Sequence, residues 1–245
     1  MGPKSWKWIF ALLAFAATAA VTSAKSSPRS DYDEAKVREA AAQSVKAAKA
    51  FNEIMDAPDK GIPQDLLARA RAIAVFPRVV KAAFLVGGEG GRGVVSRRTN
   101  AGWSDPVFFR AGGPSVGPQL GVSATDLILL FMNDDAVGGL MKDKFELGAE
   151  AGVAGGPVGR EASAGTDALM QAKILSYSRS HGAFAGVDLK GIVIHPEDDL
   201  NYAVYGRAAH ELLSDSARPN GSTAEGLAAF PQAVARYAKA SGTAH

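Results

Sequence analysis

The chain has 245 residues, with 27 lysines and arginines, 25 aspartates and glutamates, 27 glycines and no cysteine. The absence of cysteine excludes disulfides and thiolate metal sites. Two of the bases and none of the acids lie in the first 24 residues, so the rest of the chain has 25 of each and no net charge. Overall attraction to nucleic acid is therefore not predicted, although a local basic surface is compatible with this balance.

The first 24 residues have the pattern of an export signal. Lys4 and Lys7 precede an apolar run from Trp8 to Ala20, and residues 22–24 are small, as a cleavage site requires. We therefore expect an exported protein, periplasmic or secreted. The alternative is an uncleaved membrane anchor. Attachment through a lipidated cysteine is excluded because the chain has none.

The remaining residues are predicted to form one domain over 25–213, followed by an alanine-rich helix or tail over 214–245. Apolar residues recur at helical spacing from Asp31 to Met55. We expect this helix to dock on the domain through a narrow apolar face, and the alternative is that it lies on a membrane. Pro63 opens a second, short helix over Gln64–Ala70.

The segment from Arg69 to Arg98 is the most one-sided in charge, with seven bases against the single acid Glu89. Two apolar runs flank the glycine cluster Gly87–Gly93, and this pattern predicts two strands joined as a hairpin. Three of these glycines match the dinucleotide-binding spacing G-x-G-x-x-G. That function requires a following helix, whereas the residues after Gly93 are typical of a strand.

The chain then alternates short apolar runs with glycine-rich turns, which predicts mainly strands. Strands are expected over Trp103–Arg110, Ser115–Ser123, Thr125–Met132, Ile174–Arg179, Ala183–Leu189 and Gly191–His195. Helices are expected over Asp134–Lys142 and Asp198–Leu213. Residues 127–132 are continuously apolar, as a strand buried on both faces would be.

The sequence contains no recognisable catalytic centre. Ser115 lies in a G-x-S-x-G pattern, but a nucleophile elbow requires a helix after the serine, and strand-like residues follow. Four residues could in principle bind a divalent metal: His195, Asp198, Asp199 and His210. Acids after a strand are more typical of a helix cap. We therefore predict no enzymatic activity, no cofactor and no metal.

Several short motifs occur together in the order found in one protein family. They are Ala72–Pro77, Gly87–Gly93, Gly102–Ser104 with Pro106, Gly117–Gly121, Gly155–Arg160, Tyr177–Ser180 with Gly182, Phe184, Gly186 and Gly191, and Asn201 with Tyr205 and Gly206. From about Asp33 to Leu213 the chain thus resembles the SYLF domain family, as a bacterial, exported member. The resemblance implies an α+β fold, with amino-terminal helices packed on a curved, mainly antiparallel β-sheet or barrel-like core.

The resemblance also implies binding of phospholipid, including phosphoinositide, without catalysis. The candidate headgroup-binding residues are the bases Arg69, Arg71, Arg78, Lys81, Arg97 and Arg98. The candidate membrane-contacting residues are the large side chains of the first helix: Val37, Val45 and Phe51. We expect the bases to contribute more than this helix, because few large apolar side chains are available on it.

Two alternatives to lipid binding are compatible with the sequence. The bases can be solvated charges of an edge strand that prevent aggregation. They can also pair with the acid-rich residues 121–150 of another copy, which would make the protein a structural or protein-interaction module of the cell envelope. The predicted partner is an anionic phospholipid or membrane surface and not nucleic acid, with a protein partner as the second choice. The lipid species and the oligomeric state are left open.

Overall fold

The computed structural model describes residues 28–57, 61–148, 152–157, 172–180, 183–184, 189, 191–214 and 224–238. Within these ranges the side chains of residues 28–32, 82–86, 115–122 and 183–184 are not described. The predicted export signal over residues 1–24 lies outside the described residues. Among the helices that are described, none combines the length and apolar character needed to span a membrane.

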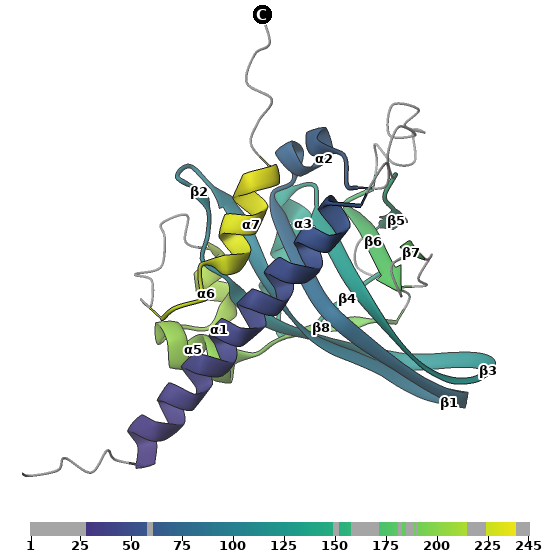
Figure 1. Cartoon of the computed structure of the whole chain (residues 1–245), viewed down its shortest axis with the longest axis horizontal. Helices are drawn as coiled ribbons and strands as arrows, with labels where there is room; N and C mark the ends of the chain where they lie inside the picture. The colour runs from purple at the N-terminus through teal and green to yellow at the C-terminus, as the bar shows by residue number, and fades with distance from the viewer. Residues whose placement is uncertain are drawn as a thin grey trace, which may run out of the picture.

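A strongly curled mixed sheet forms a half-barrel, and α1 runs across it (Figure 1). The strands are β1 Ala72–Thr99, β2 Gly102–Trp103, β3 Val107–Phe131, β4 Phe145–Glu146, β5 Val153–Gly155, β6 Ile174–Ser180, β7 Ala183–Phe184 and β8 Val193–Pro196. The helices are α1 Pro28–Met55, α2 Gln64–Arg69, α3 Asp134–Gly139, α5 Asp198–Tyr205, α6 Ala209–Ser214 and α7 Ala229–Tyr237. Among the described strands, only β5 and β6 pair in parallel, and the α+β fold on a mainly antiparallel sheet is confirmed.

The predicted hairpin over residues 69–98 is right in bringing the two ends of this segment together, and wrong in placing a turn at the glycine cluster between two separate strands. Residues 72–99 form one continuous strand, β1, and its partner along nearly its whole length is β3. The glycine cluster lies inside this strand, where Gly90 pairs with Gly112. Glycines suit a turn and a strongly bent strand equally well, because both require backbones that approach closely.

Three predicted strands also differ from the structure. Residues 107–131 form the single strand β3 instead of separate strands around Gly112–Pro114 and Ala124, and the expected strand start at Trp103 is the short strand β2. The buried end of β3 is as predicted. Leu127, Leu129 and Phe131 pack on one face of the sheet, and Ile128 and Leu130 pack on the other.

β1 folds back on itself. A straight strand of 28 residues would span about 90 Å at ~3.3 Å per residue, yet the amide nitrogen of Arg98 donates to the carbonyl oxygen of Arg71 at 2.7 Å. Register shifts against β3 occur between Phe76 and Val79 and again between Ala83 and Leu85. Beyond the helices, β1 and β3 continue as an arm that points away from α1 (Figure 1).

α1 begins three residues earlier than predicted and docks on the half-barrel, as expected. Its buried face includes Ala40, Ala47, Phe51 and Ile54, which pack against α7 and the sheet. Apart from Phe51 and Ile54, the apolar residues of this face are alanines, so the helix backbone can approach closely. Val45, which the helical spacing placed on the docking face, is 48% exposed.

The other short elements follow the predictions with shifted bounds. α2 and α3 occur where helices were expected. The predicted helix over 198–213 is wrong as one element, because Gly206 adopts a left-handed φ of 67° and separates α5 from α6. Gly191–His195 appears as β8, and of the predicted strand Ala183–Leu189 the described part is β7. In the alanine-rich tail, α7 packs beside α1.

Candidate functional site

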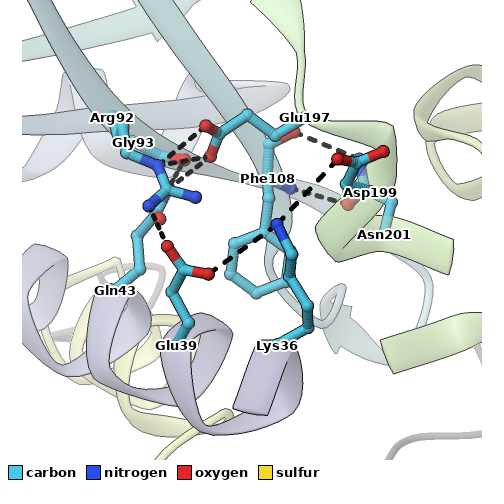
Figure 2. Close-up of polar contacts among 9 residues, drawn as sticks. All are labelled: Lys36, Glu39, Gln43, Arg92, Gly93, Phe108, Glu197, Asp199 and Asn201. Atoms are coloured by element: carbon cyan, nitrogen blue, oxygen red, sulfur yellow. Dashed lines mark hydrogen bonds and ion pairs between the residues drawn. The ribbon is translucent and has the colours of Figure 1, made fainter. Parts of the chain in front are cut away.

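An ion-pair cluster fastens α1 to the half-barrel (Figure 2). Arg92 of β1 donates from Nε to both carboxylate oxygens of Glu197, at 2.7 and 3.0 Å. Its Nη1 donates to Glu39 of α1. Lys36, one turn earlier on α1, lies 3.9 Å from Glu39 and from Asp199 of α5. Arg92 thus joins α1 to the segment that leads from β8 into α5.

Amide side chains complete this junction. Gln43 of α1 is buried and donates from Nε2 to the carbonyl oxygen of Gly93 at 2.7 Å. Asn201 of α5 is fully buried, accepts from the amide nitrogen of Phe108 at 2.9 Å and donates to the carbonyl oxygen of the same residue at 3.1 Å. These bonds satisfy backbone groups of the sheet (Figure 2). They fix the position of α1 relative to β1 and of α5 relative to β3.

The cluster shifts the ionisation of its charged members. The hydrogen bond from Arg92 lowers the pKa of Glu39 below its ordinary value of 4.5. Burial alone would lower the pKa of Arg92, but its hydrogen bonds to Glu39 and Glu197 outweigh that effect and raise the pKa. Both groups are therefore charged at neutral pH.

We expect Glu39→Gln to make the free energy of unfolding less dependent on pH in the acid range. A carboxyl whose pKa is lowered by folding stabilises the protein above its unfolded-state pKa, and this stabilisation is lost as the pH falls through the folded-state pKa. The stabilisation that Glu39 provides is therefore lost over a pH range below its ordinary pKa of 4.5. Its side chain is 41% exposed, so solvent screening keeps the effect small. Urea unfolding of both proteins across this range measures it, and an unchanged slope would contradict the Arg92–Glu39 pairing.

An open groove of about 700 Å³ lies beside the cluster, between α1 and the bulge of β1 at Pro77 and Arg78. The residues that line it are Glu39, Ala42, Gln43, Lys46, Lys49, Ala50, Glu53, Pro77, Arg78, Arg92 and Asp126. Seven of these come from one face of α1. The groove therefore exists only because α1 crosses β1.

Two of the predicted headgroup-binding bases have structural partners. Arg98 donates to the carbonyl oxygens of Ala70 at 2.9 Å and Leu67 at 2.7 Å, which caps the end of α2. Its guanidinium also lies 4.4 Å from the ring centre of Trp103. Arg97 donates to the carbonyl oxygen of Leu213 and, at 3.2 Å, to Asp134. Neither residue is a free surface charge.

The other four predicted bases are more accessible and fall into two places. Arg69 and Arg71 are exposed beside the end of α2, and Arg71 makes a loose ion pair with Asp134 at 3.9 Å. Arg78 is exposed and Lys81 half-buried farther along β1. Within the described part of the chain, the side chains of Arg69, Arg78 and Lys81 form no hydrogen bond or ion pair. The fold thus does not gather the six bases into one patch.

The three helix residues predicted to contact a membrane also separate. Phe51 is fully buried and packs edge-on against Phe230 and Tyr237 of α7, with ring centres 6.3 and 5.9 Å apart. Val37 is half-buried and Val45 is exposed. A docked α1 therefore offers a membrane little apolar surface.

Comparison with known proteins identifies the family. Residues 112–234, half of the chain, match the family model described as Ysc84, Las17-binding protein actin regulator. The chain belongs to the Ysc84 (SYLF) family. This assignment confirms the resemblance seen in the ordered motifs.

Relatives of the Ysc84 chain occur in animals and yeast. It is 34% identical over 186 residues to the SH3 domain-containing YSC84-like protein 1 of Bos taurus, covering 73% of this chain and 54% of that protein. It is 35% identical over 167 residues to the LAS seventeen-binding protein 3 of Saccharomyces cerevisiae, covering 66% of this chain and 36% of that protein. The chain thus spans about half of one relative and about a third of the other. The name of the yeast relative describes a binding protein.

The catalytic and metal patterns considered in the sequence find little geometric support in this Ysc84 chain. No helix follows Ser115, because β3 continues to Phe131, so the nucleophile elbow is excluded. Asp198 accepts from the amide nitrogen of Ala209 at 2.9 Å, and His195 lies 3.2 Å from the carbonyl oxygen of Asp143. Among the described residues, no three His, Asp or Glu side chains are grouped as a metal site requires.

Sequence reasoning missed the groove. The sequence assigned no role to Lys46 or Lys49, and Arg92 counted only as one base of the 69–98 segment. The spacing of Lys46 and Lys49 places them on one helix face, but the pattern does not say that β1 lies opposite that face. A long-range contact supplies this information.

Proposed function

We propose that this Ysc84-family protein is a non-enzymatic protein that binds anionic phospholipid at a membrane surface of the cell envelope. The carrying observation is the accessible charge on and beside β1, from Arg69, Arg71, Arg78 and Lys81. Each base near an anionic membrane contributes up to ~1 kcal/mol. Export to the envelope remains a proposal based on the pattern of residues 1–24.

The docked state of α1 supports a division of this binding between bases and helix. Phe51, the largest of the predicted membrane-contacting side chains, is buried in the core and cannot contact a membrane while α1 is docked. The bases need no rearrangement to reach a surface. Their contribution fades with added salt, because the Debye length is ~10 Å at 0.1 M.

We expect the triple variant Arg69→Glu, Arg71→Glu and Lys81→Glu to lose binding to vesicles of phosphatidylglycerol and phosphatidylcholine. Co-sedimentation at low salt measures the loss. Arg97 and Arg98 are left intact because their partners lie in the fold, and Arg78 because it also lines the groove.

The matched control reverses three other surface charges: Arg38→Glu, Lys144→Glu and Arg236→Glu. It changes the net charge equally and should keep most of the binding. Equal loss in both variants would reduce the effect to net charge. Binding by the wild type that does not depend on anionic lipid would overturn the proposal.

A second candidate function is binding of a protein partner, which the names of the relatives favour. Pairing of the basic and acidic segments between copies is less favoured than the sequence indicated. Asp134 pairs with Arg71 and Arg97 of its own chain, and Asp135 lies 3.5 Å from Lys173. Light scattering against salt tests self-association. A monomer at low salt removes pairing between copies, and an oligomer that dissociates as salt rises supports it.

A further inference from the structure

The groove between α1 and β1 has the size and chemistry of a small-molecule site. Its volume of about 700 Å³ lies within the ~300–1,000 Å³ typical of such sites. Small side chains, Ala42, Ala50 and Pro77, form part of its wall and leave room between the charged groups.

The groove is lined by more bases than acids: Lys46, Lys49, Arg78 and Arg92 against Glu39, Glu53 and Asp126. Glu39 is bound by Arg92, and Glu53 accepts from Nη1 of Arg179 at 2.9 Å. Lys49 makes only a loose contact with Glu53, at 3.9 Å, and is 78% exposed. Within the described residues, Lys46 forms no hydrogen bond or ion pair. The helix wall therefore presents two available ammonium groups, three residues apart on one face.

Arg78 faces these lysines from an unusual backbone conformation. Its φ of 53° is left-handed, which non-glycine residues adopt rarely. The conformation is held by the bulge after Phe76 and by Asp126, whose Oδ1 accepts from the amide nitrogen of Arg78 at 2.8 Å. Glycine or asparagine would fit this backbone with less strain. A residue kept in such a conformation is a reason to look for a role of its side chain.

We propose that this groove binds one phosphomonoester group, held by Lys46, Lys49 and Arg78. Near neutral pH a phosphomonoester carries a charge of about −1.5 to −2 and three strong acceptor oxygens. A guanidinium can bind two of these oxygens at once, and lysines act as point charges beside it. The phosphomonoester can belong to a lipid headgroup or to a free metabolite. The lipid form rests on the proposed function, whereas binding of the group itself does not.

The test uses glycerol 3-phosphate as the free probe, followed by amide shifts in NMR titrations. We expect binding that weakens about tenfold or more in the variant Lys46→Gln, Lys49→Gln and Arg78→Asn. Asparagine tolerates the left-handed backbone, so this variant should fold. The control variant Arg69→Gln, Arg71→Gln and Lys81→Gln should keep the affinity. Binding should also weaken from about pH 7.5 to about pH 5.5, as the phosphate gains a proton.

Vesicles distinguish the two sources. Preference for phosphatidic acid over phosphatidylglycerol, lost in the groove variant, assigns the site to a lipid phosphomonoester. Binding of glycerol 3-phosphate without that preference assigns it to a free one. Absence of glycerol 3-phosphate binding, or equal binding by the groove variant, overturns the inference. Vesicle binding through Arg69, Arg71 and Lys81 would still stand in that case, so the two proposals fail separately.

Discussion

Replacing Gly93 by alanine is expected to lower the free energy of unfolding by about 3 kcal/mol, at the upper end of the range for overpacked cores. A Cβ at this residue would lie 2.4 Å from Cδ1 of Phe76 and 2.5 Å from the carbonyl oxygen of Val75. Phe76 is fully buried and Val75 is held in the sheet, so neither can move aside cheaply. Gly93 is needed because the two halves of β1 pack directly on each other.

Gly90→Ala is the matched control, since Gly90 lies in the same strand. The atom nearest to its added Cβ is the carbonyl oxygen of Ala111, at an ordinary contact distance of 3.6 Å. Its effect should stay within about 0.5 kcal/mol, as for most substitutions without a packing cost. Urea unfolding of both variants measures the difference. Equal stability of the two variants would contradict the folding back of β1.

This contrast explains why the sequence predicted the fold class and not the path of β1. The ordered motifs predicted the family and the α+β fold, and both are confirmed. The continuous apolar run of residues 127–132 also predicted correctly that this strand is buried on both faces. The glycines of residues 87–93 did not show whether the chain turns or bends. The decisive contacts, such as Gly93 against Phe76, join residues that no local pattern connects.

The candidate site shows the same division between local and long-range information. Counting bases identified Arg69, Arg71, Arg78 and Lys81, which are accessible. The count could not separate them from Arg98, because the carbonyl groups that Arg98 caps belong to a helix about 30 residues earlier. Lys46 and Lys49 line one groove with Arg78, and no local pattern in the sequence predicts this arrangement. Charge is readable from sequence, whereas the availability of each charge is a property of the fold.

Replacing Phe51 by alanine should cost about 3–5 kcal/mol of unfolding free energy, the usual cost of removing a fully buried aromatic side chain. Phe51 has no exposed surface, and its ring packs edge-on against Phe230 and Tyr237 of α7. The truncation would leave a cavity where α1, α7 and the sheet meet. Thermal and urea unfolding of the protein measure the loss.

Val45→Ala on the same helix is the control, because Val45 is 48% exposed and its loss should change the unfolding free energy by less than about 0.5 kcal/mol. The pair of variants also decides what α1 does at a membrane. If α1 stays docked, Phe51→Ala destabilises the protein, and its folded fraction binds vesicles as the wild type does. If α1 instead leaves the half-barrel to enter lipid, the substitution should weaken vesicle binding and cost little stability. That second result would contradict the docked helix. It would show that the apolar face of α1 binds the membrane, instead of the bases on and beside β1.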